Sequence, residues 1–224
     1  PSGIRRTISA EELELGFRSS AIKRGALTGI VLGVTFLLEV ADDGLSLPIL
    51  YNQLAESLGS PPLGTAPLEE VRRTVISIRA SKGMILDESD PDSASVGSFF
   101  LNPIVSEKIS MKLPSAAPRW FLGDNSPELV VPIGSRPRSS AIVYEPAEVK
   151  LSAAWLIEHS GITKGFSLGA SRAAISSKHA LAIVNRGGAA AAEIAELARF
   201  IRTSVRNKTG IQLEPEPSLI GIDI

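Results

Sequence analysis

The sequence has no cysteine and only two histidines, His159 and His179, in 224 residues. The lack of cysteine excludes disulfides, zinc–thiolate sites and thiol nucleophiles. Two histidines also make a histidine-rich metal site a poor explanation, so we expect no bound metal. Aromatic residues make up 5% of the chain and hydrophobic residues 44%. This balance predicts an aliphatic core and is too apolar for a disordered chain.

The chain also lacks an excess of either charge, with 23 Lys and Arg against 24 Asp and Glu and a formal net charge of -1. A polyanion partner such as DNA or RNA is therefore not expected, although a local anion site is compatible with a balanced total. One hydrophobic run, residues 26–40, is shorter than the ~20 residues that a membrane-spanning helix needs, and Glu39 interrupts it. Its β-branched residues predict one or two buried strands within residues 30–40.

The first residues, "PSGIRRTISAEELELG", are polar and show no signal peptide, and they do not begin with Met. We therefore expect a cytoplasmic protein that makes no membrane contact. A monomer is expected as well. The chain is expected to be a fragment or a processed piece of a longer polypeptide.

Hydrophobic periodicity and terminal signals predict an α+β protein. Asn52 is a candidate N-cap for a short helix, and Ser152 for another. A strand is expected to end near Asn185, loops are expected over 87–95 and 103–149, and two prolines keep 211–224 extended. The predicted helices cover 52–59, 67–83, 150–161 and 189–210, the last with a buried stripe of Ile194, Leu197, Ala198, Ile201 and Val205.

The stretch "SVGSFFLNP" places one hydroxyl, Ser98, between Gly97 and two phenylalanines. A small residue in a tight turn is the ordinary explanation for a serine. No Gly-x-Ser-x-Gly elbow surrounds it, so a hydrolase nucleophile is poorly supported. The alternative is a hydroxyl aimed into an apolar pocket, where Gly97 lets another group approach the backbone closely.

Two further sites combine charge with a rigid or aromatic setting. Glu214 and Glu216 alternate with prolines in "LEPEP", which is typical of a solvated edge strand but would also hold a catalytic acid rigidly. Arg18 lies in "GFRSSAIKRG". This is either a basic surface turn or an arginine placed for a carboxylate or a phosphate.

Other candidate residues are weak when taken alone. Lys82 ends a predicted helix, where a cation ordinarily complements the helix dipole. His179, in "SSKHALAIVN", is more often a surface or hydrogen-bonded histidine than a ligand. The glycines form neither a GxGxxG dinucleotide fingerprint nor a Walker loop.

Taken in order, these motifs resemble the UDP-N-acetylenolpyruvoylglucosamine reductase family of peptidoglycan synthesis, over nearly the whole chain. The pieces that carry the resemblance include "GFRSSAIKRG", "LYNQLAESLG", "RASKGMILDESDPDSASVGSFFLNP", "ISSKHALAIVNRGGA" and "IQLEPEPSLIG". The Gly-Ser-Phe-Phe-x-Asn-Pro and Leu-Glu-Pro-Glu motifs at this separation are specific. The wording of "SKGM" and "RGGA" is similar to actinobacterial members.

The resemblance implies a role for each matched residue. Ser98 would protonate the substrate carbon, with Arg18 and Glu216 stabilising the intermediate and Arg18 and Gly97 beside the flavin. Tyr51 would close over the substrate, and Lys82 and Asn102 would hold the UDP diphosphate. His179, Lys150 and Glu158 match further polar positions of the substrate pocket.

The resemblance also implies a flavoenzyme that uses FAD and NADPH to reduce UDP-N-acetylglucosamine-enolpyruvate to UDP-N-acetylmuramate. The family's FAD-binding N-terminal half has no counterpart in this chain, and Phe17 stands where the family commonly has tyrosine. The implied organisation is the end of the flavin domain over 1–85, the substrate domain over 86–208, and a C-terminal return over 209–224. An isolated UDP-sugar-binding fragment without redox activity is the alternative, and a generic α+β domain with a coincidental serine is a third.

Overall fold

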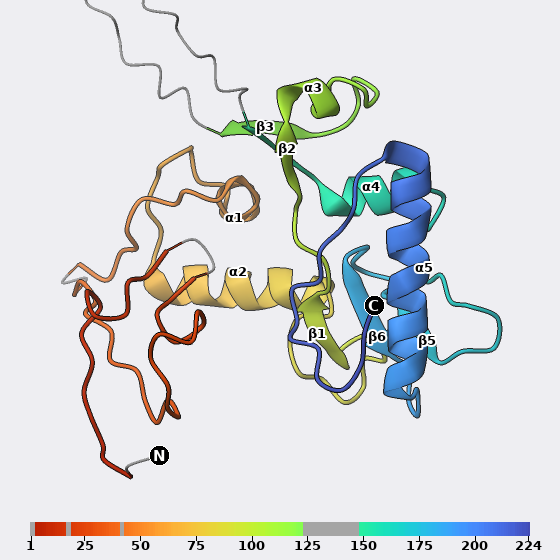
Figure 1. Cartoon of the computed structure of the whole chain (residues 1–224). Helices are drawn as coiled ribbons and strands as arrows, with labels where there is room; N and C mark the ends of the chain where they lie inside the picture. Colours follow the sequence, from red (N-terminus) through yellow and green to blue (C-terminus); the bar gives the residue numbers. More distant parts are fainter. Residues whose placement is uncertain (1–2, 17–18, 41–42, 123–147) are drawn as a thin grey trace, which may run out of the picture. The chain divides into compact units, whose positions relative to one another are not determined.

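A computed structural model describes residues 3–16, 19–40, 43–122 and 148–224 of the chain. These residues belong to two compact units, Pro1–Leu45 and Ser46–Ile224. Figure 1 shows the helices and strands, all of which lie in the second unit.

The described residues of the first unit form turns without a helix or a strand. Ser9 and Glu12 exchange hydrogen bonds between side chain and backbone, at 2.9 and 3.2 Å, and Ala21 is buried. The prediction of a buried strand within residues 30–40 is wrong, because these residues are neither strand nor buried. Leu37 and Ile30, for example, are 102% and 87% exposed. A strand is stabilised by a neighbour that pairs its backbone, and no described strand pairs with this segment.

Helices α1, Asn52–Leu58, and α2, Leu68–Ser81, open the second unit and pack on each other. Ile49, Ala55 and Ala66 form a small buried cluster with them. Both helices were expected, but the N-cap of α1 is Tyr51, and Asn52 is its first helical residue. At the other end of α2, Gly83 takes the left-handed conformation, with φ of 66°, and turns the chain away.

The first sheet contains three antiparallel strands in the order β1-β6-β5. Strand β1, Ser95–Ser98, has an irregular register against β6, Ala182–Asn185, which in turn pairs with β5, Ala173–Ile175. The expected strand end at Asn185 is confirmed.

The second sheet has the order β2-β4-β3 and is also antiparallel. Strands β2, Ile104–Ser106, and β3, Arg119–Leu122, flank β4, Glu148–Leu151, and helix α3, Glu107–Ser110, follows β2. The prediction of one long loop over 103–149 is therefore wrong at both ends. Short strands of three or four residues carry too little periodicity to be recognised, and residues 123–147 lie outside the described part.

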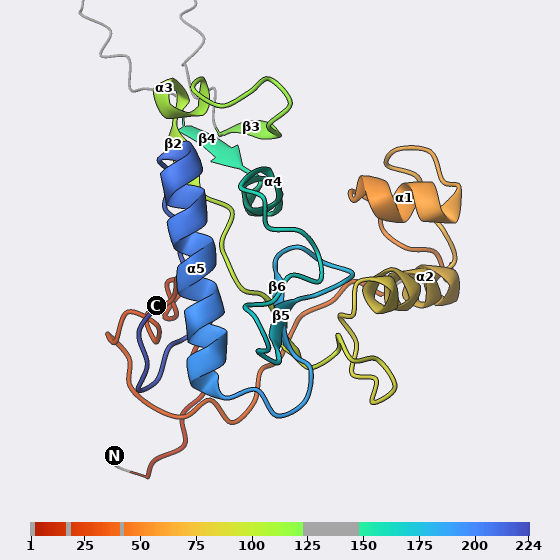
Figure 2. The ribbon, with the colours of Figure 1, turned by 90° about the vertical axis from the view of Figure 1, so that its right-hand side faces the viewer.

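Helix α4, Ala153–His159, and helix α5, Ala191–Thr209, were both expected. The Ser152 side chain accepts a hydrogen bond from the backbone N–H of Trp155 at 3.2 Å, which confirms it as the N-cap of α4. Helix α5 crosses α4 and packs against it and against β5 and β6 of the first sheet (Figures 1 and 2). Leu197, Ala198, Ile201 and Val205 of its predicted stripe are buried, and Ile194 is partly buried.

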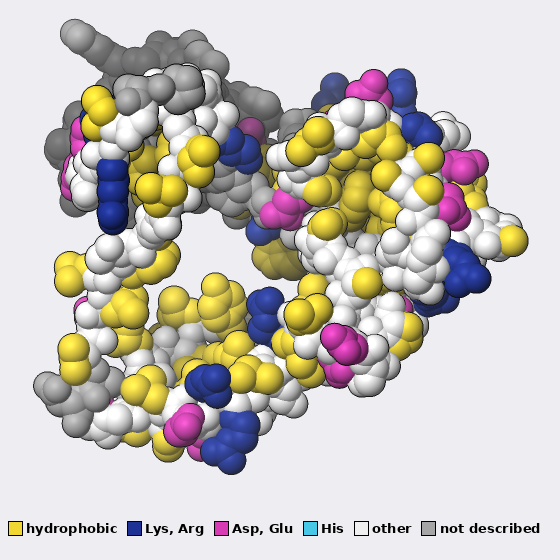
Figure 3. All heavy atoms as spheres, turned by 90° about the horizontal axis from the view of Figure 1, so that it is seen from below, with side chains coloured by type: hydrophobic (Ala, Val, Ile, Leu, Met, Phe, Trp, Pro, Cys, Tyr) yellow, Lys and Arg dark blue, Asp and Glu magenta, His cyan; other side chains and the backbone are white. Residues whose placement is uncertain are grey.

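The main core of the second unit joins α4, α5 and both sheets with the aromatic pair of "GSFF". Antiparallel sheets with packed helices confirm the α+β class. Basic and acidic side chains are interspersed on the face drawn in Figure 3. Among the described residues, no helix is both long and apolar enough to cross a membrane.

Candidate active site

Ser98 ends strand β1, and the two aromatic rings that follow it anchor it in the core. Phe99 and Phe100 are 4% and 1% exposed, and their rings meet edge to face with centroids 5.1 Å apart. Ser98 itself is half-buried and pairs with Ala182 of β6. The preceding Gly97 has φ of 80°, and a Cβ added there would meet no atom within 4 Å. The backbone beside Ser98 therefore has an open flank, which another group can approach.

The C-terminal segment brings Glu216 to the same place by backbone pairing. The N–H of Glu216 donates to the carbonyl of Phe99 at 2.9 Å, and the N–H of Leu101 donates to the carbonyl of Glu214 at 2.9 Å. An isolated β-bridge between Phe100 and Pro215 lies between these two bonds. Residues more than a hundred positions apart in the chain thus place Glu216 next to the residue that follows Ser98, and the Glu216 side chain is exposed.

His179 lies on the turn between β5 and β6, on the other side of Ser98. The carbonyl of Leu181 accepts a hydrogen bond from the N–H of Phe99 at 2.8 Å, so this turn continues directly from the strand that pairs with Ser98. The Nδ1 atom of His179 accepts from the N–H of Leu181 at 3.3 Å. Because Nδ1 is an acceptor, the neutral imidazole carries its proton on Nε2.

Two lysines give the His179 turn a positive environment. Burial lowers the pKa of His179 from its usual value, and the charges of Lys82 and Lys164 lower it further. Lys82, the C-cap of α2, also donates from Nζ to the side-chain oxygen of Gln53 at 2.6 Å. Two cations and a neutral N–H donor are a suitable set for binding an oxyanion.

Asn102 has a structural contact in addition to its predicted role. Its Oδ1 accepts from the N–H of Ala153 at 2.9 Å, at the first residue of α4. The side chain therefore satisfies one of the N–H groups that a helix leaves unpaired at its start. Its remaining amide N–H groups are chemically suited to a phosphate oxygen, and the diphosphate contact stays a prediction.

The other candidate residues predicted from the sequence lie on several different elements. Lys150 is on β4, paired with Ile104 and Trp120, and is half-buried. Glu158 is an exposed residue of α4, and Tyr51, at the start of α1, is 78% exposed. Arg18 lies outside the described residues, so its predicted role beside Glu216 is untested.

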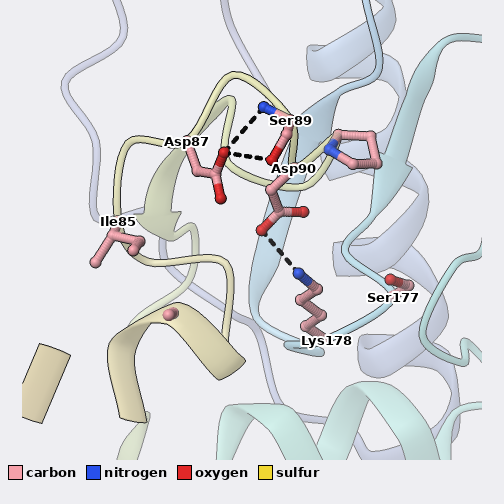
Figure 4. Close-up of a pocket in the computed structure, with 8 residues that line it drawn as sticks. Ile85, Asp87, Ser89, Asp90, Ser177 and Lys178 are labelled. Atoms are coloured by element: carbon pink, nitrogen blue, oxygen red, sulfur yellow. Dashed lines mark hydrogen bonds and ion pairs between the residues drawn. The ribbon is translucent and has the colours of Figure 1, made fainter. Parts of the chain in front are cut away.

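Two cavities flank this region. One of about 490 Å³ is mostly apolar and runs between β1, α5 and the C-terminal segment, with Val96, Phe99, Ile194 and Leu219 among its walls. The other, of about 440 Å³, lies between the acidic loop and the His179 turn (Figure 4). There the Nζ of Lys178 is 2.8 Å from Asp90 Oδ2, and Asp87 accepts from the backbone and the hydroxyl of Ser89 at 2.9 and 2.6 Å. Ser98 lines neither cavity.

Sequence reasoning missed two residues of this site. Lys164 lies in "GITKG", which the sequence indicates only as a turn, and its charge acts on His179. Asp92 belongs to an acidic run that predicts a solvated loop, yet it is 2% exposed. Both depend on contacts between distant segments, and neither has a signature in the local sequence.

Comparison with known proteins identifies a family profile and several relatives that match this chain. A family profile described as "UDP-N-acetylenolpyruvoylglucosamine reductase, C-terminal domain" matches residues 90–220. The Leifsonia xyli UDP-N-acetylenolpyruvoylglucosamine reductase is 50% identical over 97% of this chain and 60% of its own length. The Corynebacterium jeikeium protein of the same name is 40% identical over 97% of this chain and 52% of its own length. A Mycobacterium tuberculosis protein of that name is 39% identical over 98% and 56%.

Fold and site together define an α+β domain in which backbone pairing places the end of β1, with Ser98, between the His179 turn and the segment that carries Glu216. The chain belongs to the UDP-N-acetylenolpyruvoylglucosamine reductase family. It spans a little over half the length of the relatives that it matches.

Proposed function

We propose that the chain is the substrate-binding part of an NADPH- and FAD-dependent reductase. The proposed enzyme converts UDP-N-acetylglucosamine-enolpyruvate to UDP-N-acetylmuramate. The observation that carries the proposal is the backbone pairing that places Ser98 and Glu216 on adjacent segments, in a chain 50% identical to a reductase of this name. A sequence motif alone would not require these two residues to be neighbours.

His179 and the two lysines whose charges act on it are suited to the diphosphate of a UDP-sugar. Lys82 and Lys164 supply charge, and the Nε2–H of neutral His179 supplies a directed donor. A diphosphate bound there would hold the sugar, and the enolpyruvyl group that it carries, near the end of β1. Lys150, Glu158 and Tyr51 are proposed to contact outlying parts of the substrate.

Only one side of a flavin site is present. The open flank of Gly97 fits the approach of a planar ring, and we propose that Gly97 and Arg18 would lie against it. The sequence has no glycine-rich loop of the kind that cradles a dinucleotide phosphate. When bound, the reduced flavin would supply hydride to the terminal carbon of the enol ether, and NADPH would supply the electrons.

The residues of this chain would complete the reduction. Negative charge develops at the carbon next to the hydride acceptor and on its carboxylate, where Arg18 would stabilise it by its charge and Glu216, as a protonated acid, by donating a hydrogen bond. Ser98 would donate its hydroxyl proton to that carbon, and solvent would later return a proton to the serine. A serine is a weak acid in water, so this step requires exclusion of water and a fixed position. The buried rings of Phe99 and Phe100 supply the fixed position.

The second candidate function is UDP-sugar binding without redox activity. It is favoured by the span of the chain, which covers only 52–60% of these relatives. The exposed apolar segment at 30–40 favours the reductase instead, because a further part of the polypeptide would cover it.

Fusing the chain to the upstream part of the Leifsonia xyli reductase distinguishes the two candidates. We expect the fusion to be yellow and to oxidise NADPH when the enolpyruvyl UDP-sugar is added. We expect the 224-residue chain to be colourless and to bind the UDP-sugar. A fusion that holds flavin but never reacts with the substrate would contradict the reductase proposal.

A further inference from the structure

Asp92 is a buried carboxylate that joins three segments of the candidate site. It is 2% exposed and stands three residues before β1. A Cβ added at Gly83, the residue after Lys82, would lie 3.2 Å from the carbonyl oxygen of Asp92. On its other side, its carboxylate contacts the β5–β6 turn that carries His179. The residue therefore lies at the junction of the α2 exit, β1 and the turn.

The Asp92 carboxylate is held by a full set of donors. Its Oδ2 accepts from Ser176 Oγ at 3.0 Å, from Ser177 N at 2.7 Å and from Ser177 Oγ at 2.6 Å. Its Oδ1 is 3.7 Å from the guanidinium of Arg186. Burial raises the pKa of Asp92, but the bonds from Ser177 and Ser176 and the charge of Arg186 outweigh it and leave the pKa lowered. The carboxylate is thus ionised and accepts from both hydroxyls.

The hydroxyl of Ser176 connects Asp92 to the backbone of His179. Because its proton points to Asp92, its lone pairs are free to accept, and they accept from the N–H of Lys178 at 3.0 Å and from the N–H of His179 at 3.2 Å. The Ser177 hydroxyl also donates to Asp92, but among the described residues the backbone N–H of His179 donates to the Ser176 hydroxyl and not to Ser177. Ser176 is buried and Ser177 is exposed, and of the two hydroxyls only that of Ser176 links Asp92 to the histidine.

We propose that Asp92 is a positioning residue for substrate binding, and that it acts through the Ser176 hydroxyl on the backbone and imidazole of His179. The part of this proposal that concerns binding of a UDP-sugar rests on the proposed function. The positioning of His179 is a property of the chain without ligand. Two measurements therefore test it separately.

The first measurement is the ¹⁵N NMR spectrum of the imidazoles, with His159 as an internal reference. Wild type should show His179 with Nδ1 as the acceptor and the proton on Nε2. Ser176→Ala should shift the His179 signals towards a mixture of tautomers, because the bond from Leu181 to Nδ1 loosens when the turn loses its anchor. Ser177→Ala, which loses the shorter hydroxyl bond to Asp92, should leave them in place. Equal shifts in both variants, or none in Ser176→Ala, would overturn the proposal.

The second measurement is binding of UDP-N-acetylglucosamine to the 224-residue chain by calorimetry. Ser176→Ala should weaken binding about tenfold, as expected for one displaced donor, and Ser177→Ala by less than about twofold. Asp92→Asn should behave like Ser176→Ala, with a folded circular dichroism spectrum. If wild type does not bind the probe, the proposed function fails and the NMR result alone decides the positioning. If wild type binds but Ser177→Ala and Ser176→Ala weaken binding equally, Asp92 is only a structural anchor and the inference is wrong.

Discussion

Replacing Lys82 by methionine should weaken UDP-sugar binding and raise the pKa of His179 together. Lys82 lowers the pKa of His179 through its charge, so its removal must move that pKa upwards. A hydrogen bond to a charged group contributes about 1.5–3 kcal/mol when it is well formed. Lys82 is half-exposed and already bonded to Gln53, so solvent screening and the cost of exchanging that partner favour the lower part of the range. We therefore expect a loss of about 1–2 kcal/mol, roughly five- to thirtyfold in the dissociation constant.

The assay combines calorimetry at two salt concentrations with an NMR titration of the two histidines. Because the attraction between a cation and a diphosphate is screened by salt, the gap between wild type and Lys82→Met should narrow as salt rises. Lys178→Met is the matched control, since Lys178 is next to His179 in sequence but its Nζ is 2.8 Å from Asp90. The reasoning would be refuted if Lys178→Met raised the pKa of His179 as much as Lys82→Met, or if Lys82→Met bound the UDP-sugar with unchanged affinity.

Three further predictions test the proton donor, the flavin and the buried carboxylate. In the fusion with the upstream part of a relative, Ser98→Ala should let NADPH reduce the flavin normally but slow reoxidation by substrate about 10²–10⁴-fold, with partial recovery in Ser98→Cys; stopped-flow rates at wild-type level would make Ser98 a turn residue. After incubation with FAD and dialysis, the 224-residue chain should retain no yellow colour. A stoichiometric flavin spectrum after dialysis would count against this prediction. Because the folded pKa of Asp92 is lowered, its stabilisation is present above the ordinary aspartate pKa and is lost as pH falls through the lowered value. Urea unfolding of Asp92→Asn should lack that acid-dependent loss, and identical pH profiles would refute the assignment.

The sequence was sufficient to predict helices α1, α2, α4 and α5, because their signals are local. The buried stripe of α5 repeats every three or four residues, and the Ser152 cap of α4 acts three residues away. The strands at 104–106 and 119–122 could not be predicted this way. They are three and four residues long, and they exist because β4 lies between them.

Sequence motifs were sufficient to name Ser98, Glu216 and His179 as candidate site residues. How these residues are arranged could not be predicted from the sequence. No local pattern states that the N–H of Glu216 bonds the carbonyl of Phe99, because that contact depends on how the last segment returns to β1. The burial of Asp92 could not be predicted from the local sequence either. An acidic run is normally solvated, and only the donors of the β5–β6 turn make burial of this carboxylate tolerable.

We expect the positive charge around His179 to assist proton donation by Ser98 as well as substrate binding. A serine becomes a better proton donor where positive charge stabilises the alkoxide that it leaves. The His179 turn leads directly into β6, which pairs with Ser98, and the charges of Lys82 and Lys164 act on His179. Keeping His179 neutral is part of this arrangement. A third full charge on the turn would bind the diphosphate more tightly in both substrate and product, which lowers KM without speeding the reaction. In the proposed site, a neutral Nε2–H would instead orient the ligand while the two lysines would provide the positive field. In the proposed enzyme, the lowered pKa of His179 would therefore favour turnover over tighter binding of substrate and product.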